Sequence, residues 1–542
     1  MSGFRFSCLA LCLAGGAAFA DPLNIVVIVA DNQSAEAIGA YGNRDVATPH
    51  IDRLARDGIR FDRAYAASGM CSPTRATLLT GLMPSQHGLH DALHDAWVEQ
   101  QQTGWSAIAE FRTLPLTLAN RGYQTAMIGK WHIGDPTHPS LGFQHWVALP
   151  YGHTTDFWQN ELVENGSRYP VENRHIVDVF AEKAVAYHEA LDASQPFYLQ
   201  LNLDGPYALP PSNYGPARNR HYAHHVGQQF QSMPREPIHD QILSRLDGPF
   251  EAGKKLSELR GSAIWDHLLY GTIRMQGDPE SYANFLSQNE MVDDAVGRVR
   301  ATLEKRGLAE ETLIVYTADQ GNLYGQHGTW GHTIWFTPAH LYEQALRIPL
   351  LVVHPRATAG RTSERLVGQY DLAPTLLEIA GIEGVEFTGS PGQSFATALR
   401  DPEAAKDASE VAKDESEAVF FEEGETRGVR TRRYAYWKRL EGFGEPALFD
   451  MQADPEQRHD IFAELARDPS GRAVIARLDD LLEGFFAKYS DPDHDLWHQG
   501  TSKGTPSKPD LWLRHQPWPW LKKYWRDYVS KPESAPAFAE QL

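Results

Sequence analysis

Near-continuous apolar runs, rich in β-branched residues, alternate along the chain with segments of helical periodicity. The first run, residues 23–30, has the pattern of a strand buried on both faces. Similar runs follow at residues 124–128, 196–202, 313–317 and 350–353. Helical patterns lie between them, most clearly at residues 281–305 and 371–380. Strands that alternate with helices in this way predict an α/β fold with a large, mostly parallel sheet covered on both faces.

Polar residues follow several of the predicted strands directly. They are Asp31, Asn32, Lys130, His132, Asp319 and Gln320. In open α/β sheets, ligands bind at the carboxyl ends of the strands. The topology therefore predicts that these side chains belong to one site.

Residues 207–279 depart from the alternating pattern. They are rich in Pro, Gly and His and indicate an insertion, in which His221, His224 and His225 stand close together. These histidines could bind a metal ion, but they lack a regular ligand spacing. A solvated loop is therefore the favoured interpretation.

The C-terminal part of the chain predicts a second, smaller α+β unit. Its predicted elements are a linker, two short strands and a helix, at residues 400–417, 418–421, 434–439 and 475–488. The expected division is a main domain, a subdomain with an antiparallel sheet and an aromatic-rich extension, at residues 21–400, 401–490 and 491–542. The extension carries Trp497, Trp512, Trp518, Trp520 and Trp525. These rings could line a sugar site, although packing onto the main domain is favoured.

Residues 1–20 have the features of a signal peptide. Arg5 supplies a basic start, a small and apolar stretch follows, and Ala18-Phe19-Ala20 before Asp21 fits the cleavage pattern. A buried N-terminal helix and a lipoprotein signal are the weaker alternatives. The signal predicts that the mature chain is periplasmic or secreted.

The composition is that of a globular protein, since 42% of the 542 residues are hydrophobic and 22% are charged. Fifty Lys and Arg against 70 Asp and Glu give a net charge of −20, which argues against binding to nucleic-acid backbones. Outside the N-terminus, no apolar run approaches the ~20 residues of a membrane helix. An anionic substrate stays compatible, because the local charge of a site can oppose the net charge.

Removal of the signal changes the meaning of the cysteine count. The sequence has 3 cysteines, and Cys8 and Cys12 would leave with the signal. Cys71 then stands alone and cannot form an intramolecular disulfide. A lone thiol in an oxidising compartment is either buried and inert or chemically special.

The segment CSPTRATLLTG at residues 71–81 predicts a helix that begins at Cys71, with Pro73 in its first turn and Gly81 at its end. A helix N-terminus favours negative charge on this side chain. The segment matches the C-x-P-S/T-R signature and the trailing T-G of the sulfatase family, which the chain resembles. Further motifs of that family follow in order at residues 122–134, 317–321, 341–350, 371–377, 447–450 and 454–455. The resemblance therefore covers nearly all of the mature chain.

The resemblance implies an alkaline-phosphatase-like three-layer sandwich and the activity of a sulfuric ester hydrolase. In this family a formylglycine-generating enzyme oxidises the signature cysteine, here Cys71, to formylglycine. The hydrated aldehyde attacks sulfur, releases the alcohol or amine, and then expels sulfate through its second hydroxyl. A lone cysteine in an exported protein is what this chemistry requires.

The resemblance also implies a divalent cation. The expected ligands are Asp31, Asn32, Asp319, Gln320 and the group derived from Cys71. Hard oxygen donors favour Ca²⁺, with Mg²⁺ as the second choice. Family members usually carry two carboxylates in place of Asp31-Asn32, and Asn or His in place of Gln320. Two carboxylates alone would balance the charge of the cation. The cation would then be a stronger Lewis acid than one bound by more carboxylates.

Three further residues take catalytic roles by resemblance. Arg75 should hold the formylglycine and the metal carboxylates in place, and Lys130 should neutralise a sulfate oxygen. His132 should take the proton from the diol as the aldehyde forms again. Without the resemblance, an exposed turn would be the favoured interpretation of Lys130 and His132.

Two positions depart from the family pattern. Tyr207 stands where a leaving-group histidine is expected, and His332 stands where a sulfate-binding lysine is expected after the segment that contains His327. Tyr207, His327 and His332 are candidates for substrate binding, and His332 is also a candidate leaving-group acid. Lining of the pocket is the alternative role for each.

The sequence thus predicts an exported sulfatase that acts on a sulfated carbohydrate or an aryl sulfate. A phosphodiesterase or phosphonate monoester hydrolase of the same superfamily is one alternative, and a non-catalytic glycan-binding relative is another. Asn32, Tyr207 and His332 keep the second alternative open, whereas the intact motif at residues 71–75 counts against it. The sequence does not distinguish an O-sulfate from an N-sulfate.

Overall fold

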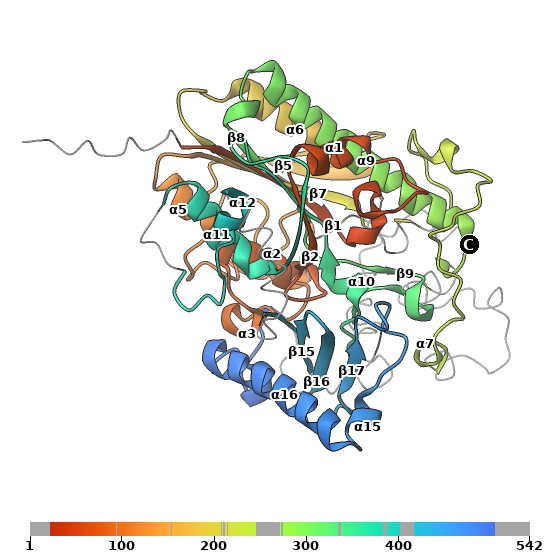
Figure 1. Cartoon of the computed structure of the whole chain (residues 1–542). Helices are drawn as coiled ribbons and strands as arrows, with labels where there is room; N and C mark the ends of the chain where they lie inside the picture. Colours follow the sequence, from red (N-terminus) through yellow and green to blue (C-terminus); the bar gives the residue numbers. More distant parts are fainter. Residues whose placement is uncertain are drawn as a thin grey trace, which may run out of the picture.

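Figure 1 shows the computed structural model of the chain. It describes residues 22–504 except 94, 153, 155, 208, 210–211, 214, 245–271, 273–274, 334–335, 337, 383–386 and 401–416. The predicted signal peptide, most of the predicted linker and the tryptophans beyond Trp497 lie outside the described residues. Within the described part, every helix is too short or too polar to cross a bilayer.

An 11-stranded mixed sheet forms the centre of the molecule (Figure 1). Its strands follow the order β11, β2, β12, β8, β1, β7, β3, β4, β5 and β6, and β13 pairs with β2. Their bounds are β1 Asn24–Asp31, β2 Ile59–Tyr65, β3 Gln124–Gly129, β4 His145–Ala148, β5 Gln159–Glu164, β6 Ser167–Glu172, β7 Phe197–Pro206, β8 Thr312–Ala318, β11 Arg347–Ile348, β12 Leu350–Val353 and β13 Arg361–Gly368.

The middle of the sheet consists of the parallel strands β8, β1, β7, β3 and β4. All 8 residues of β1 are buried, which explains its unbroken apolar pattern. Strand β12 runs antiparallel to both β8 and β2, so the sheet is mixed toward that edge. An apolar run indicates burial on both faces but does not specify the direction of the strand.

Helices cover both faces of the sheet and give three layers (Figure 1). One face carries α1 Pro49–Asp57, α6 Ile176–Ala190 and α9 Pro279–Lys305. The other face carries α2 Cys71–Thr80, α5 Leu114–Ala119, α11 Leu372–Ile379 and α12 Ala396–Arg400. This is the three-layer α/β architecture that the sequence predicted.

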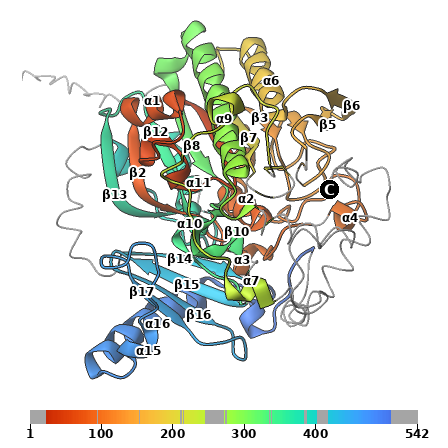
Figure 2. The same cartoon turned by 90° about the vertical axis from the view of Figure 1, so that its right-hand side faces the viewer.

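A separate antiparallel sheet of 4 strands lies below the main sheet in Figures 1 and 2. Its elements are β14 Ala418–Glu423, β15 Thr426–Thr431, β16 Tyr434–Arg439 and β17 Ala447–Asp450, followed by α15 Phe462–Leu465 and α16 Pro469–Tyr489. Glu423 joins this sheet to the main domain, because its Oε2 accepts hydrogen bonds from Ser68 Oγ at 2.6 Å and from the Gly69 N–H at 3.0 Å. The second sheet therefore supports the segment that leads into Cys71.

Short elements complete the described chain. They are α3 Pro84–His87, α4 Asp95–Val98, α7 Asp240–Ser244, α10 Glu343–Leu346, β9 Leu323–Tyr324, β10 Trp330–Gly331 and the 3-10 turns η1 Ala35–Ala37, η2 Gly39–Tyr41, η3 Tyr222–His224, η5 Ala309–Glu311, η6 Gln326–Gly328, η8 Gln369–Asp371 and η9 Leu496–His498. The predicted insertion contributes η3 and α7. Asn219 anchors it to α9, since its side-chain nitrogen donates to Ser287 Oγ at 2.8 Å.

Candidate active site

Strands β1 and β8 deliver two pairs of polar side chains to adjacent positions. Ala30 pairs with Ala318 in the parallel ladder, so Asp31-Asn32 and Asp319-Gln320 emerge side by side. Asp319 Oδ1 accepts hydrogen bonds from the backbone N–H groups of Asn32 at 3.1 Å and Gln320 at 2.8 Å. All four side chains are buried. The structure thus brings four of the five predicted cation ligands together.

Cys71 begins helix α2, and its side chain reaches the same point. Its Sγ lies 3.9 Å from Asp31 Oδ1, 3.8 Å from Asn32 Oδ1 and 3.0 Å from the amide nitrogen of Gln320. Burial raises the pKa of the Cys71 thiol to about 12, although Lys130 opposes this shift. At neutral pH the unmodified side chain is therefore a protonated thiol and a poor nucleophile.

Two buried cations face the carboxylates of this centre. Lys130 Nζ lies 2.6 Å from Asp31 Oδ2 and 3.6 Å from Cys71 Sγ. Arg75 donates from Nη2 to Asp319 Oδ2 at 2.7 Å and from Nη1 to the backbone oxygen of Lys130 at 3.1 Å. Burial alone would raise the pKa of Asp31, but Lys130 and Arg75 hold it below its usual range. Burial and the nearby Asp31 charge raise the pKa of Asp319 to about 6.

The donor atoms of the centre fit a hard divalent cation. Cys71 and the carboxylates of Asp31 and Asp319 each offer an atom within 4.8 Å of the other two. As drawn, the Gln320 amide nitrogen donates to Asn32 Oδ1 at 2.5 Å, but with its oxygen and nitrogen exchanged the nitrogen donates to Asp319 and the oxygen faces Asn32 Oδ1. Two amide oxygens that face each other beside two carboxylates form a group of acceptors that Ca²⁺ would stabilise.

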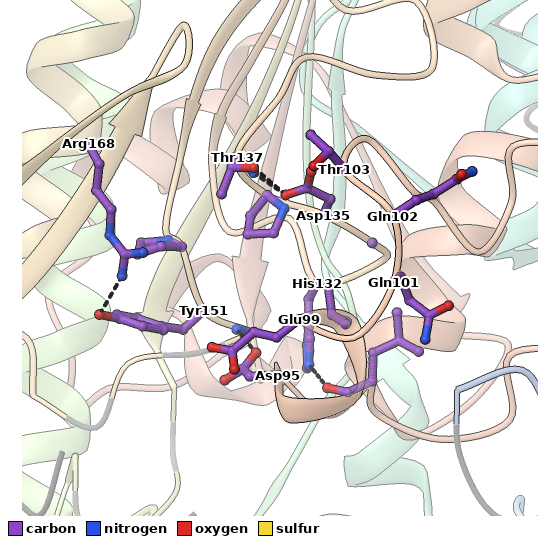
Figure 3. Close-up of a pocket in the computed structure, with 16 residues that line it drawn as sticks. Asp95, Glu99, Gln101, Gln102, Thr103, His132, Asp135, Thr137, Tyr151 and Arg168 are labelled. Atoms are coloured by element: carbon purple, nitrogen blue, oxygen red, sulfur yellow. Dashed lines mark hydrogen bonds between the residues drawn. The ribbon is translucent and has the colours of Figure 1, made fainter. Parts of the chain in front are cut away.

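His132 lies beside the centre through its backbone, and its ring lines a neighbouring pocket (Figure 3). Ser72, which follows Cys71, donates from Oγ to the backbone oxygen of His132 at 2.6 Å. The ring nitrogen Nε2 lies 3.0 Å from the backbone oxygen of Leu93. In this structure the imidazole belongs to the pocket wall, and proton transfer at position 71 stays a prediction.

The pocket has a volume of about 200 Å³ and a lining of both polar and apolar groups (Figure 3). Among its lining residues are Asp95, Glu99, Gln101, Gln102, Thr103, His132, Asp135, Thr137, Tyr151 and Arg168. Tyr151 and Arg168 are fixed relative to each other by a hydrogen bond of 3.1 Å. Carboxylates, amides and a phenol are groups that can hydrogen-bond the hydroxyls of a sugar.

Tyr207 contacts the centre directly. Its backbone N–H donates to the Asp31 backbone oxygen at 3.0 Å, and Lys130 Nζ lies 4.9 Å from the centre of its ring. A cation over an aromatic face is an attractive arrangement that restricts the ammonium group. The structure therefore brings Tyr207 together with Lys130.

His332 and His327 occupy different surroundings. His332 is buried, and the next residue, Thr333, packs closely on Gly69 in the segment that leads to Cys71. The ring of His327 stacks on Tyr342 with centroids 3.6 Å apart, and burial lowers its pKa to about 3. His327 is therefore neutral at physiological pH. Substrate binding by these two histidines stays a prediction.

Asp204 is a buried carboxyl group at the centre that the sequence pattern did not reveal. Burial raises its pKa well above the usual range, Asp31 raises it further and Lys130 opposes. The predicted strand ended at residue 202. Strand β7 instead continues through an irregularity until Pro206 pairs with Asp31. Asp204 therefore follows the same rule as the predicted residues, a polar group at the carboxyl end of a parallel strand.

Comparison with known proteins agrees with this geometry. The family model of sulfatases matches residues 23–382, which contain every residue described at the centre. The chain belongs to the sulfatase family. A second family model, for the C-terminal part of N-sulphoglucosamine sulphohydrolase, matches residues 329–485. The protein is thus a sulfuric ester hydrolase with an alkaline-phosphatase-like fold.

Individual relatives match this sulfatase over most of its length. N-acetylglucosamine-6-O-sulfatase of Bacteroides thetaiotaomicron is 29% identical over 528 residues, with 87% of this chain and 88% of the relative covered. Human arylsulfatase A is 27% identical over 482 residues, with 84% of this chain and 87% of the relative covered.

Solved structures show the same fold. A protein in complex with its substrate D-glucosamine-2-N,6-O-disulfate superposes with a TM-score of 0.62 at 25% identity, covering 88% of this chain and 99% of that protein. A phosphonate monoester hydrolase of Agrobacterium radiobacter gives a TM-score of 0.62 at 19% identity, covering 87% and 96%. The second likeness concerns the fold alone.

Proposed function

We propose that this sulfatase removes sulfate from a sulfated glucosamine unit of a carbohydrate, with formylglycine at position 71 and a bound Ca²⁺. The proposal is carried by the position of the Cys71 side chain. Its Sγ lies between the paired strand ends, 3.0 Å from Gln320, and 3.6 Å from the buried ammonium of Lys130. An oxygen nucleophile at this position would stand beside both a cation site and a fixed positive charge.

Conversion of Cys71 to formylglycine would replace a poor nucleophile, the protonated thiol, with a better one. The thiol stays protonated at neutral pH, because burial raises its pKa to about 12. The hydrated aldehyde supplies an oxygen nucleophile and a second hydroxyl for the release of sulfate. Because the Cys71 side chain is buried, a formylglycine-generating enzyme would have to reach it before folding is complete.

Asp31, Asn32, Asp319 and Gln320 would hold the cation through oxygen atoms. Such a donor set favours Ca²⁺ over metals that prefer nitrogen or sulfur, with Mg²⁺ as the second choice. When bound, the cation supplies positive charge at the point where sulfate and the position-71 group meet. The carboxylates of Asp31 and Asp319 balance that charge.

Lys130 and Arg75 have different electrostatic roles in this proposal. Lys130 is close enough to position 71 to neutralise an oxygen of the transferring sulfuryl group. Arg75 fixes Asp319 through its Nη2 and the backbone of Lys130 through its Nη1. Arg75 therefore fixes the position of Asp319, a cation ligand, relative to Lys130, which binds sulfate.

We assign proton transfer to His132 and His332. His132 takes the proton from position 71, and the hydrogen bond from Ser72 to its backbone oxygen keeps this residue next to the start of α2. His332 donates a proton to the leaving group or binds sulfate, and His327 contributes to substrate binding. Tyr207 positions Lys130 and contacts the substrate, supported by the 4.9 Å separation of the ammonium and its ring.

The choice of substrate follows the relatives and the pocket. Their names include an N-acetylglucosamine-6-O-sulfatase and a protein bound to D-glucosamine-2-N,6-O-disulfate. The pocket beside His132 offers hydrogen-bonding groups for the sugar ring (Figure 3). The predicted signal peptide leads us to place the enzyme in the periplasm or outside the cell.

Parallel kinetics on four substrates tests this proposal. The full-length enzyme, coexpressed with a formylglycine-generating enzyme, is assayed on glucosamine-6-O-sulfate, glucosamine-2-N-sulfate, an aryl sulfate and an aryl phosphate diester. We expect the highest kcat/KM on one of the two glucosamine sulfates. A preference for the aryl sulfate alone would overturn the sugar assignment. A preference for the phosphate diester would instead support the phosphodiesterase alternative.

A further inference from the structure

A second group of metal-ligand side chains lies outside the catalytic centre. His221 and His224 at η3 meet Glu290 of α9, and each residue offers a ligand atom within 4.8 Å of the other two. From the sequence alone these histidines had no partner, and a solvated loop was favoured. The carboxylate that completes the group lies 66 residues beyond His224, on the long helix α9.

The orientation of His221 suits a metal ligand. Its Nε2 lies 2.7 Å from Asp294 Oδ2, and its Nδ1 lies 3.6 Å from Glu290 Oε2. Since a carboxylate only accepts hydrogen bonds, Nε2 carries the proton of the 2.7 Å contact with Asp294, and Nδ1 is the ring nitrogen directed at Glu290. Metal-bound histidines commonly donate their other N–H to a carboxylate in this way. Two ligands of a tetrahedral zinc ion lie about 3.4 Å apart, close to the observed separation.

Glu290 is a buried carboxylate, and one of its oxygens faces two histidine rings. The residue is 4% exposed, and its Oε1 accepts the backbone N–H of Ala47 at 3.0 Å. Its Oε2 accepts no hydrogen bond within the described part of the chain, although His225 Nε2 lies 3.1 Å away. Burying a charged oxygen without a donor is unfavourable, so this atom points to a cation.

The loop that carries the histidines is held on α9 independently of them. Asn219 Oδ1 accepts the backbone N–H groups of His221 and Tyr222 at 3.0 Å each, and its side-chain nitrogen donates to Ser287. Arg220, the cation next in sequence, donates to Asp294 at 2.8 Å and to Asp178 at 2.7 Å. Its charge is therefore shared by two carboxylates. Contacts of Asn219 and Arg220, rather than of the histidine rings, thus hold the loop in place on α9.

A neighbouring group shows what a non-binding cluster looks like. His50, Asp293 and Asp294 also offer ligand atoms within 4.8 Å of one another. Asp293, however, uses both oxygens to accept backbone N–H groups at the start of α1, from Ile51 at 2.7 Å and His50 at 3.2 Å. Its carboxylate is thus satisfied by the helix terminus.

We propose that His221, His224 and Glu290 bind a zinc ion that fastens η3 to α9. His225 is available as a fourth ligand, and Asp294 orients His221. Two imidazoles and one carboxylate suit zinc better than the hard cations expected at the catalytic centre. The site is structural: it couples the insertion to the helix whose Asn289 accepts a hydrogen bond from Gln33 at 2.8 Å, next to Asn32.

Zinc titration of the full-length, calcium-loaded enzyme tests this site. Binding is measured by calorimetry, and Co²⁺ is used as a spectroscopic probe of nitrogen ligation. His224→Ala removes a ligand from an exposed position, so it should fold normally. Glu290→Gln keeps an oxygen for the Ala47 N–H and removes the charge. His50→Ala is the matched control from the neighbouring cluster.

We expect one zinc ion per chain in the wild type and in His50→Ala. His224→Ala and Glu290→Gln should each weaken this binding by about 10-fold or more. Zinc should also raise the Tm of the wild type and of His50→Ala, but not that of the two ligand variants. Equal zinc affinity in all four proteins, or no stoichiometric zinc binding in the wild type, would overturn the assignment. Both readouts are independent of the sulfatase reaction.

Discussion

The fold positions the candidate metal ligands of the catalytic centre and those of the second group, His221, His224 and Glu290, in different ways. At the catalytic centre, Asp31 and Asp319 follow neighbouring parallel strands, so the ladder itself sets their spacing. In the second group, an irregular turn meets the middle of a helix, and contacts such as Asn219 with Ser287 set the spacing. At the catalytic centre the pairing of strands sets the positions of the oxygen ligands. In the second group the packing of a turn on a helix sets the positions of the histidines and the carboxylate.

The two regions also differ in charge. Buried Lys130 and Arg75 pair with the carboxylates of the catalytic centre and make it ready for an anion. The second group has the Glu290 carboxylate and neighbouring histidines. The first region is suited to chemistry on sulfate, and the second is suited to holding a cation. Changes in the two regions should therefore affect different observables.

The largest effect is expected from Cys71→Ala. This variant removes the residue that we propose as the precursor of the nucleophile, so kcat should fall by about 10³-fold or more. The change is small and buried, and Tm should stay within a few degrees of the wild type. Steady-state kinetics and thermal unfolding measure the two quantities. Near-native turnover would refute the role of this residue.

The second largest effect is expected from Lys130→Ala. Its Nζ lies 2.6 Å from Asp31, with both side chains buried, so the variant leaves Asp31 with only its 3.7 Å ion pair to Arg75 and loses the charge proposed to bind sulfate. We expect a loss of about 10²–10³ in kcat/KM, together with a lower Tm. Lys183→Gln is the matched control, because Lys183 forms a half-exposed pair with Glu164 at the same 2.6 Å separation. A surface pair of this kind contributes only about 0–1 kcal/mol to stability. Equal losses in both variants would deny Lys130 a catalytic role.

Removal of calcium and removal of zinc should have different effects, the first on activity and the second on stability. Dialysis against a calcium chelator should lower the sulfatase rate, and Ca²⁺ should restore it more fully than Mg²⁺. A zinc-selective chelator should lower Tm and leave kcat within about twofold, because a structural ion stabilises the folded state by its binding free energy. Loss of activity with the zinc chelator, reversed by zinc alone, would place zinc at the catalytic centre.

A smaller effect concerns a histidine of the scaffold. Burial of His188 in α6 lowers its pKa from 6.5 to about 4, so the unfolded chain binds a proton that the folded chain does not bind. The stabilisation from the neutral ring is present above pH 6.5 and is lost as pH falls toward 4. Between pH 7 and 5 the loss is about 2 kcal/mol. His188→Leu should flatten the decline of Tm over this interval, and an unchanged slope would contradict it.

The sequence predicted the main features of the fold because the strands of the parallel core are buried on both faces. It placed Asp31, Lys130 and Asp319 after strands, and those strands meet at one edge of the sheet. Asp204 was missed because the predicted strand ended at residue 202, whereas β7 continues through a local irregularity to Pro206. The direction of the His132 ring was also beyond prediction, because it depends on a backbone φ of 61° and on a hydrogen-bond partner in another segment.

The second region could not be predicted for a different reason. The histidines of η3 and Glu290 belong to separate segments, and no strand ladder relates them. Their meeting depends on how an irregular insertion packs on α9, which side-chain contacts decide. Periodicity predicts which face of a helix is buried, but it does not identify the loop that covers that face.

Mass spectrometry of the tryptic peptide from Ala64 to Arg75 tests the central claim most directly. The enzyme is purified from its native host and from a strain that lacks a formylglycine-generating enzyme. We predict that the native peptide carries an aldehyde at position 71, that the control peptide carries cysteine, and that only the first preparation hydrolyses sulfate esters. A fully active enzyme with unmodified Cys71 would contradict the account.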